Sequence, residues 1–345
     1  MVSLETPTAS PVPPTATATL TPTVTPTPTD TPSPTATLPP VVHFMAVGDV
    51  MLARTIGDRI LAEGPAAPFA GVLPILNEAD LLVANLECAI SERGELQPKA
   101  YTFRAPPIAA ESLALAGIDV VSLANNHALD YGFDALADTL QLLGERQIAG
   151  VGAGPNDAAA HAPVIVERNG LRVAFLAYVD VPVESRSGFD TRVWIAGPNS
   201  PGVAWAEPDR IAADVAAAKA QADVVIVLLH TGLESRTEVT AGQRTLAHAA
   251  VDAGAALVLG AHPHVLQGVE SYNGGLIAYS LGNFVFDDFT FPENYSAIFT
   301  ATLTPDGVAA YDWVPVVVED GLPRLATPEE APQILERVQP LENSQ

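Results

Sequence analysis

Short, continuous apolar runs alternate with amphipathic helical patterns from residue 41 onwards. Continuous runs of valine, leucine and isoleucine are typical of strands that are buried on both faces, with helices packed over them. The pattern therefore predicts a layered α/β domain. The expected strands are residues 42–47, 81–84, 120–123, 164–167, 171–178, 224–229, 256–259 and 276–280. The expected helices are residues 69–79, 107–116, 133–145, 209–222 and 241–253.

The pattern changes toward the end of this domain, which we expect to span residues 41–320. Residues 295–318 predict a hairpin around the turn signal Pro305-Asp306-Gly307. Residues 321–345 are acidic and interrupted by proline, and we expect them to form a peripheral tail. No run reaches the ~18 to 20 apolar residues that a membrane span requires.

The first forty residues have the composition of a disordered linker. They hold 11 of the 31 prolines and 13 threonines, with almost no charge. Such a segment cannot bury enough surface to offset the entropy cost of ordering it. Threonine- and proline-rich stalks typically space a domain from a surface, so we expect an extracellular or surface-anchored protein whose signal or anchor is not in this sequence. A disordered tail on a cytosolic protein is the alternative.

The charge of the chain disfavours two classes of partner. The 345 residues include 40 acidic and 16 basic side chains, which gives a formal net charge of −24. Proteins that bind nucleic acid or dock on anionic lipid need a basic face, and a chain this acidic is repelled by both. We therefore expect no nucleic acid partner. The single cysteine, Cys88, excludes an internal disulfide framework and a zinc site built from several cysteines.

Residues that can bind metal ions follow five of the expected strands. In α/β sheets the ligand-binding crevice lies beyond the carboxyl ends of the strands. One aspartate or histidine at a strand end is usually a cap or a turn residue, but five such strand ends together indicate a metal site. The residues concerned are Asp49, Glu87, Asn125, Asn126, His127, His230, His262 and His264.

The residue types suit divalent transition metals. Aspartate and glutamate supply anionic oxygen ligands, and a carboxylate between two cations offsets their repulsion. Neutral imidazoles favour manganese, iron or zinc over calcium. His262 and His264 are two residues apart, so both point to one side of an extended backbone. The amide of Asn126 is a weak ligand, whereas His127 is free to act as a general acid or as a cation that faces a substrate oxyanion.

A series of motifs resembles one known family. The motifs are GDVMLAR (48–54), NLECAIS (85–91), YTFRAPP (101–107), SLANNHALDYG (122–132), HTGLE (230–234), GAHPHVLQGVE (260–270) and YSLGNFVFD (279–287). In this order they resemble the CapA family of poly-gamma-glutamate capsule biosynthesis proteins, whose domain is similar to the calcineurin-like metallophosphoesterases. The resemblance covers residues 42–320 and implies a layered α/β/β/α sandwich.

The same resemblance implies one or two divalent metal ions, with Glu87 as the bridging carboxylate. His127 follows a ligand asparagine, as the catalytic histidine does in metallophosphoesterases. The remaining implied ligands are Asp49 and His264 for one ion, and Asn126, His230 and His262 for the other.

Two positions depart from the family pattern. Met51 stands where metallophosphoesterases usually place a second histidine, two residues after the aspartate. A thioether is a poor ligand for a hard divalent ion, so we expect the ion at Asp49 to be loosely held or absent. Thr231 follows His230, where the family leads us to expect tryptophan, and the pocket wall there is expected to differ.

Three residues beside the metal motifs are candidates for substrate binding. In a chain with few cations, Arg54 and Arg104 could each clamp a carboxylate or phosphate. An ion pair with one of the many acidic residues is the alternative for both arginines. Asn125 is the third candidate.

Two classes of function are consistent with these residues. The first is a metal-dependent hydrolase or transferase that acts at the cell surface on an anionic substrate, such as poly-gamma-glutamate or a phosphoester, with His127 protonating the leaving group. The second is a non-catalytic metal-binding module of a membrane-bound complex for polymer synthesis and export. Met51 favours the second class, and the otherwise intact ligand set favours the first. The fold cannot choose between them, because function depends on the site.

Overall fold

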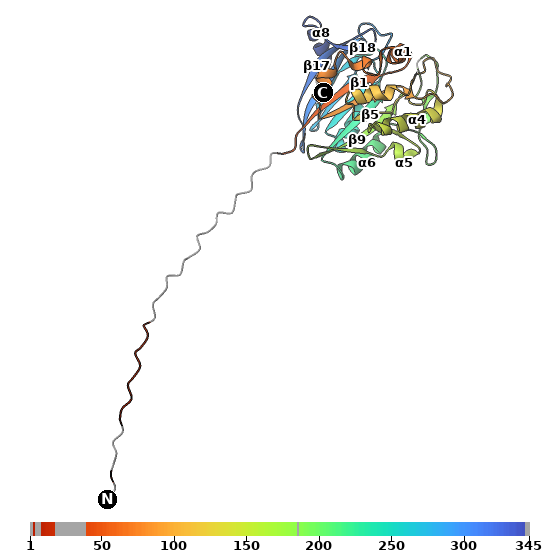
Figure 1. Cartoon of the computed structure of the whole chain (residues 1–345). Coiled ribbons are helices and arrows are strands. Elements are labelled where there is room, and N and C mark those ends of the chain that lie inside the picture. Colours follow the sequence, from red (N-terminus) through yellow and green to blue (C-terminus); the bar gives the residue numbers. More distant parts are fainter. Residues whose placement is uncertain (1–2, 4–7, 18–38, 185, 342–345) are drawn as a thin grey trace. The chain divides into compact units, whose positions relative to one another are not determined.

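The computed structural model describes residues 3, 8–17, 39–184 and 186–341. The chain divides into two units, Met1–Leu38 and Pro39–Gln345. In the first unit residues 3 and 8–17 are described, and they form no helix or strand. The expected disorder of residues 1–40 falls mostly outside the described residues and stays a prediction. The helices and strands of the described residues all lie in the second unit (Figure 1).

The first sheet is eight-stranded and mixed. Its strands are β1 (Val42–Val50), β2 (Leu81–Leu86), β5 (Val120–Ser122), β6 (Ala149–Val151), β15 (Asn283–Val285), β16 (Tyr295–Thr304), β17 (Gly307–Glu319) and β18 (Leu322–Leu325). Their order is β18-β17-β16-β1-β2-β5-β6, and β15 also pairs with β1. Strands β1, β2, β5 and β6 run parallel, whereas β16, β17 and β18 pair antiparallel. The hairpin expected over residues 295–318 corresponds to β16 and β17.

The second sheet is six-stranded with a parallel centre. Its strands are β8 (Val164–Arg168), β9 (Leu171–Asp180), β11 (Val224–Thr231), β12 (Leu257–Ala261), β13 (Leu266–Tyr272) and β14 (Gly275–Leu281). The order is β13-β14-β12-β11-β9-β8, and only the edge strands β8 and β13 pair antiparallel. Two short ribbons pair β3 (Ala89–Ile90) with β4 (Arg104–Ala105) and β7 (Ala153–Gly154) with β10 (Gly202–Val203).

Strand β9 shows why the apolar runs are continuous. Val173 and Phe175 belong to the core that the two sheets share, whereas Ala174 and Leu176 belong to a second core beneath helices. The rings of Phe44 in β1 and Phe175 stack with centroids 6.4 Å apart, which joins the two sheets. Because successive side chains of a strand point to opposite faces, a strand covered on both faces is apolar at every position.

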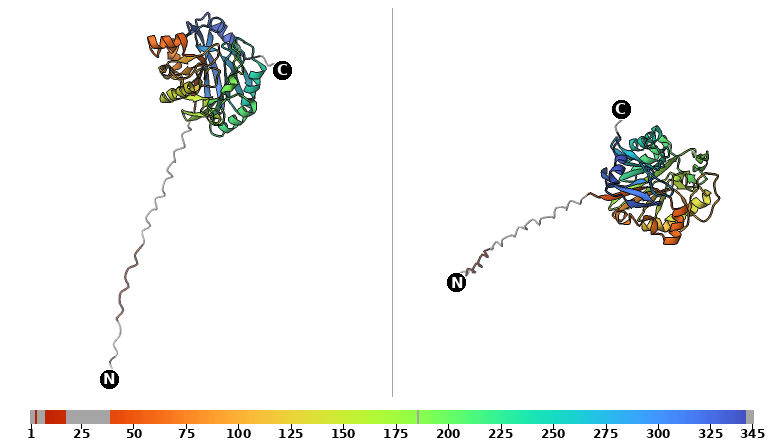
Figure 2. Two further views of the ribbon diagram at one scale, coloured as in Figure 1. Left: turned by 90° about the vertical axis from the view of Figure 1, so that its right-hand side faces the viewer. Right: turned by 90° about the horizontal axis from the view of Figure 1, so that it is seen from above.

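Helices cover the outer faces of the sheets. Those on the second sheet are α6 (Pro208–Lys219) and α7 (Ala241–Asp252). Those on the first sheet are α1 (Arg54–Glu63), α3 (Ala109–Leu115) and α4 (Gly132–Glu145). The short ones are α2 (Leu73–Leu76), α5 (Asp157–Ala160), α8 (Ala331–Leu335) and the 3-10 helices η1 (Ala67–Phe69), η2 (Thr191–Trp194) and η3 (Glu336–Val338). In Figure 2 the orange-to-yellow helices and the green-to-teal helices lie on opposite sides of the strands, which confirms the layered α/β/β/α sandwich. Within the described part of the chain, no helix has both the length and the apolar surface needed to cross a bilayer.

Several elements, among them β6 and β13, were not expected, and three further segments also differ from the prediction. The helix predicted over residues 69–79 is reduced to α2, because Pro74 is tolerated only in the first turn of a helix. Helix α1 was absent from the sequence pattern, since charged side chains interrupt its apolar positions. The described part of residues 321–345 adds β18 to the first sheet and buries Ile334 and Val338 in the core, so these residues extend the domain instead of forming a tail.

Candidate metal centre

The carboxyl ends of the central parallel strands carry the metal-ligand candidates. Asp49 in β1 is paired with Asn85 in β2, and Glu87 follows β2 directly. In the second sheet, His230 lies near the end of β11 and His262 directly follows β12. Oxygen ligands from the first sheet therefore face nitrogen ligands from the second.

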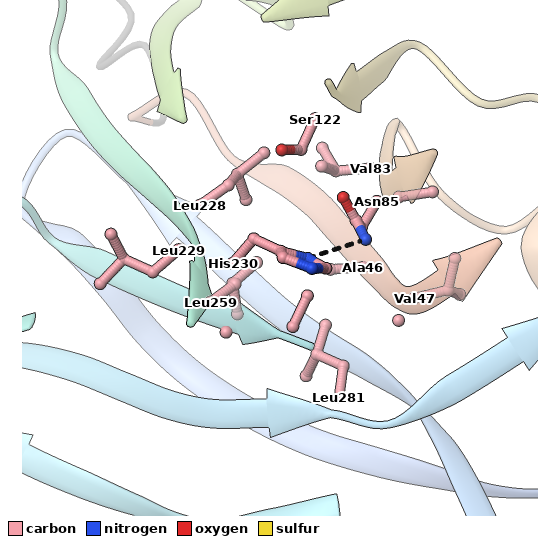
Figure 3. A pocket seen from close by; sticks show the side chains of 14 residues that line it. Ala46, Val47, Val83, Asn85, Ser122, Leu228, Leu229, His230, Leu259 and Leu281 are labelled. Atoms are coloured by element: carbon pink, nitrogen blue, oxygen red, sulfur yellow. Dashed lines mark hydrogen bonds between the residues drawn. The ribbon is translucent and has the colours of Figure 1, made fainter. Parts of the chain in front are cut away.

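Asn85 joins the two sheets at this edge. Its Nδ2 atom lies 2.8 Å from Asp49 Oδ1, 3.1 Å from Glu87 Oε2 and 3.2 Å from His230 Nδ1. Figure 3 shows the side chains of Asn85 and His230 pointing toward each other beside a cavity of about 20 Å³ with mostly aliphatic walls. One amide thus aligns two carboxylates and an imidazole.

Asp49 and Glu87 are buried carboxylates that repel each other. Both residues are fully buried. Burial, followed by the nearby charge of Asp49, raises the pKa of Glu87 well above its usual value. Glu87 Oε1 and Asp49 Oδ2 are buried without a hydrogen-bond partner. Buried polar atoms are nearly always paired, so two unpaired carboxylate oxygens at one place are suited to binding a cation.

Burial keeps the imidazoles of His230 and His262 neutral. Burial and the neighbouring histidines lower the pKa of His230 well below its usual value, and burial lowers the pKa of His262 to about 3. The two ring centroids are 4.9 Å apart. His230 Nε2 lies 2.8 Å from Asn126 Oδ1, and His262 Nδ1 is buried without a hydrogen-bond partner. Neutral imidazole is the form of histidine that binds metal ions.

Asn283 fixes the tautomer of His264. Its Nδ2 donates to the backbone oxygens of His264 and Glu293, at 3.2 and 3.1 Å, which turns its Oδ1 toward the His264 ring. His264 Nδ1 lies 2.9 Å from that oxygen and therefore carries the hydrogen. The Nε2 atom of His264 lies 3.7 Å from Glu87 Oε1. Burial lowers the pKa of His264, but the Asp49 carboxylate, whose Oδ2 lies 3.2 Å from Nδ1, outweighs burial and leaves it raised. Hydrogen bonds of this kind orient metal-binding histidines.

These side chains form two groups that can each hold a metal ion. Asp49, Glu87 and His230 form one group, and within it one ligand atom of each residue lies within 4.8 Å of the others. Glu234, His262 and His264 form the second group by the same criterion. Carboxylate oxygens and neutral imidazole nitrogens, several of them without another partner, fit divalent transition metals.

A buried lysine holds the loop that carries Asn126 and His127. Lys99 Nζ lies 2.5 Å from Asp130 Oδ1 and 2.7 Å from Glu184 Oε1, and it donates to the backbone oxygen of Asn126. Glu184 Oε1 also accepts from Asn126 Nδ2 at 3.0 Å. The side-chain oxygen of Asn126 is consequently turned toward His230.

His127 faces the first group through one nitrogen. Its Nδ1 lies 2.6 Å from Asp130 Oδ2, and its Nε2 lies 4.0 Å from Glu87 Oε1. The ring packs on Phe103 with centroids 4.2 Å apart. Burial lowers the pKa of His127, and the Asp130 carboxylate opposes that shift without cancelling it. Asp130 thus holds the Nδ1 hydrogen and leaves Nε2 directed at the site.

A pocket of about 240 Å³ adjoins the second group, because Glu234 and His264 line it together with His127. Arg54 also lines it, but its guanidinium is paired with Asp287 at 2.9 Å and with Asp288. At the pocket edge the exposed Arg186 lies over Tyr101, 5.5 Å from the ring centroid.

Unusual backbone conformations gather at this pocket. Five of the nine non-glycine residues with positive φ among the described residues lie in or beside it. Such conformations persist only where the surrounding structure imposes them, and they concentrate at functional sites. The five residues are Arg54, Ser235, His262, His264 and Asp288.

The structure brings seven of the predicted residues together and places two others differently. The seven are Asp49, Glu87, Asn126, His127, His230, His262 and His264. Asn125 is fully buried, where its Nδ2 donates to the Leu86 backbone oxygen at 2.8 Å and its Oδ1 accepts from His127 N. Arg104 is not among the pocket-lining residues, because its guanidinium donates to the backbone of Glu92 and Arg93 and lies over Tyr131.

The site residues without a role in the sequence analysis include Asn85, Lys99, Asp130, Glu184 and Glu234. Asn85, Asp130 and Glu234 stand inside the quoted motifs, and Lys99 is one of only two lysines, so a signal existed for four of them. Glu184 carried no signal, because its contact with Asn126 spans 58 positions of the chain.

The two departures from the family pattern are both buried. Met51 is fully buried and its Sδ accepts from Ala53 N at 3.1 Å, so the thioether belongs to neither metal group. Thr231 is buried at the end of β11.

Sequence comparisons agree on one family. Residues 43–288 match the family described as bacterial capsule synthesis protein PGA_cap. The chain is 34% identical over 289 residues to capsule biosynthesis protein CapA of Bacillus anthracis, which covers 81% of this chain and 68% of that protein. It is 33% identical over 280 residues to PGA biosynthesis protein CapA of Bacillus subtilis strain 168, which covers 80% of this chain and 72% of that protein. Among solved structures, a hypothetical protein from Thermus thermophilus is similar at a TM-score of 0.49 and 17% identity, over 79% of this chain and 98% of that one. A TM-score below 0.5 does not assign a fold family.

Proposed function

The chain belongs to the bacterial capsule synthesis protein family, and from this we propose that it acts in the synthesis of an anionic capsule polymer such as poly-gamma-glutamate. Its part in that process is metal-dependent hydrolysis or group transfer on the polymer, or on a phosphoester, at the cell surface. The ions are manganese, iron or zinc.

One observation carries the proposal. Glu87 Oε1, Asp49 Oδ2 and His262 Nδ1 are buried without hydrogen-bond partners, and their residues belong to two adjacent ligand groups. Leaving several buried polar atoms unpaired is unfavourable unless a ligand binds them. A divalent cation satisfies oxygen and nitrogen lone pairs together, which water or an apolar ligand cannot do as well.

His127 has the geometry of a general acid. When bound, the metal ions supply Lewis-acid activation of the bond that is cleaved. His127 can deliver a proton from Nε2 to the leaving group in its imidazolium form, which burial disfavours and the Asp130 carboxylate stabilises, while Asp130 holds the hydrogen on Nδ1 and keeps the ring in place. Phe103 covers one face of the imidazole and limits the access of water to it.

The pocket beside the site receives the anionic substrate. Arg186 at its edge presents a guanidinium on the face of Tyr101, and guanidinium groups match the planar geometry of carboxylates and phosphates. Because the chain carries a formal charge of −24, a localised cation is needed to draw an anion to this point.

The alternative is a non-catalytic metal-binding module of a membrane-bound complex for polymer synthesis. Met51 favours it, since its buried thioether, which accepts from Ala53 N, is a poor ligand for a hard divalent ion. The two functions differ in turnover and not in metal binding.

The test compares turnover in the full chain loaded with manganese, iron or zinc. Poly-gamma-glutamate and a panel of phosphoesters are offered as substrates, and released chain ends or phosphate are measured. We expect metal-dependent cleavage that chelation abolishes and the matching ion restores. A metal-loaded protein that binds poly-gamma-glutamate but cleaves nothing would replace the catalytic proposal with the binding module.

A further inference from the structure

We propose that Glu234 is a metal ligand, which lets the chain hold a second ion although position 51 is methionine. With His262 and His264 it binds one ion, while Asp49, Glu87 and His230 bind the other. This inference rests on the proposed metal-dependent function and deepens it, because it states how the chain holds a second ion despite Met51.

The three residues have the right mutual geometry. One carboxylate oxygen of Glu234 and one nitrogen each of His262 and His264 lie within 4.8 Å of one another. A cation placed among atoms this close lies no more than about 2.8 Å from each of them, so small side-chain movements bring all three to bond lengths of about 2.0 to 2.2 Å.

One of the three side chains has no other partner. His262 is 4% exposed, and its Nδ1 is buried without a hydrogen bond. A bound ligand is therefore needed to pair His262 Nδ1, because an unpaired buried polar atom is unfavourable. His264 Nδ1 faces Asn283 Oδ1 at 2.9 Å, so Nε2 is the nitrogen of this ring that remains for a cation.

The backbone holds the Glu234 loop against the two histidines. Ser235 N donates to the Pro263 backbone oxygen at 2.9 Å, which joins the residue after Glu234 to the residue between the histidines. Gln267 Nε2 donates to the Arg236 backbone oxygen at 2.8 Å and anchors the same loop from β13. Ser235, His262 and His264 all have positive φ, at 59°, 94° and 57°. Positive φ at three non-glycine residues is unfavourable, and its presence on both sides of this junction indicates a functional constraint.

Met51 supplies no hard ligand to the site, and Glu234 adds a carboxylate to it. The Met51 sulfur accepts from Ala53 N within the core, so β1 contributes Asp49 alone to the metal edge. A carboxylate is a harder ligand than a thioether and carries a charge that offsets that of the cation. Two imidazoles and one carboxylate form a known set for catalytic zinc, with a further position open to water or substrate.

The location of Glu234 predicts how this ion behaves. Glu234 is exposed and lines the 240 Å³ pocket, whereas Asp49, Glu87 and His230 are buried. The ion at Glu234 therefore faces the pocket and exchanges with solvent faster than the ion held by the buried group.

The experiment counts and titrates metal ions and does not depend on activity. The full chain, its Glu234→Gln variant and its Glu238→Gln variant are stripped of metal and titrated calorimetrically with Mn²⁺ and with Zn²⁺. Glu238 is an exposed glutamate on the same loop and outside both metal groups, so it is the matched control. Bound ions are then counted by elemental analysis after dialysis.

We expect two ions per chain in the parent and in Glu238→Gln, the second weaker than the first. In Glu234→Gln the weaker site should lose affinity by at least about 10- to 100-fold while the tighter site is unchanged. A Glu234→His variant, which restores an imidazole donor, should recover part of that loss. Two ions bound by Glu234→Gln with the affinities of the parent would overturn the inference, and so would a parent that binds one ion with an affinity that Glu234→Gln leaves unchanged.

The same titration separates this inference from the proposed function. A parent that binds no metal ion contradicts both. A parent that binds two ions, and loses one in Glu234→Gln, but shows no turnover on any substrate supports the ligand assignment and contradicts catalysis.

Discussion

This domain has a fully buried and a partly buried cluster of histidine and carboxylate, and the two differ in whether their polar atoms have partners. Beneath α6, His161 Nδ1 lies 2.8 Å from Asp214 Oδ2, and Tyr178 donates to the same oxygen at 3.1 Å. Arg210 closes this cluster by pairing with Asp214 at 3.0 Å and with Asp157 at 3.3 Å. At the metal centre, the unpaired atoms are Asp49 Oδ2, Glu87 Oε1 and His262 Nδ1.

The difference separates a cluster that stabilises the fold from one arranged for a ligand. The Asp214 cluster contains its own cation, Arg210, so its charges are compensated inside the protein. The metal centre brings two carboxylates together in a buried place, and its nearest lysine, Lys99, is already paired with Asp130 and Glu184. A fully satisfied polar network rigidifies a protein, whereas a partly satisfied one is unfavourable until its ligand binds.

The largest effect should come from His127, which the proposed chemistry needs and metal binding does not. His127→Ala is expected to lower kcat by about 10²- to 10⁴-fold, because the general acid is lost. Metal content and Tm should stay close to those of the parent. The matched control is His43→Ala, an exposed histidine in β1, which should keep full turnover. If His127→Ala were as active as the parent, His127 would not be the general acid.

Metal should stabilise the protein through Glu87. A free metal concentration of about 100 times Kd should raise the free energy of unfolding of the parent by about 2.7 kcal/mol, since the ion binds only the folded state. Glu87→Gln should lose most of this gain. Its metal-free Tm should not fall, because the substitution removes a buried charge that repels Asp49. Thermal unfolding with and without metal measures both quantities, and a metal-free variant much less stable than the parent would show that Glu87 is structural.

A substitution in the Asp214 cluster should change stability and not metal binding. Asp214→Asn is expected to lower the free energy of unfolding by about 1 to 3 kcal/mol and to leave metal content unchanged, because His161 and Tyr178 lose a buried acceptor. Asp58→Asn, an exposed aspartate on α1, is the control and should change little. A loss of bound metal in Asp214→Asn would contradict the separation of the two clusters.

Acid should remove the difference in the free energy of unfolding between Asp214→Asn and the parent. Burial raises the pKa of Asp214, but hydrogen bonds from His161 and Arg210 outweigh burial and leave it lowered. A carboxyl whose folded pKa is lowered contributes stability above its ordinary pKa and loses that contribution as pH falls through the folded value. The gap between parent and Asp214→Asn should therefore be largest near neutral pH and should close below the ordinary aspartate range.

The smallest effect concerns recognition of the substrate at the pocket edge. Arg186→Ala should raise KM for an anionic substrate by about two- to fivefold with kcat unchanged, because an exposed charge contributes little in water. Arg104→Ala should leave KM unchanged, since Arg104 lies outside the pocket. A higher KM in Arg104→Ala than in Arg186→Ala would indicate that the substrate binds on the side of the domain where Arg104 lies.

The sequence pattern was sufficient to predict the layers of the domain and the edge of the sheets at which the metal-ligand residues lie. The eight predicted strands are all present. In all of them but β8, whose Ile165 is exposed, the apolar run is buried because both faces of the strand are covered. Asp49, Glu87, His230, His262 and His264 meet because the carboxyl ends of parallel strands point to the same edge, and that follows from local pattern and topology alone.

Which loops fold back onto that edge depends on contacts between residues that are distant in the sequence. Glu184 and Glu234 come from loops without periodic sequence, and their positions depend on contacts with Asn126 and with the backbone of Pro263. The tertiary structure also decided that Arg54 is paired with Asp287 and that Arg104 points away, since any arginine in so acidic a chain has many possible partners and only packing selects one. Strand positions are set by burial, a property each segment carries in its own side chains, whereas a loop side chain acquires its role only from the neighbours that folding gives it.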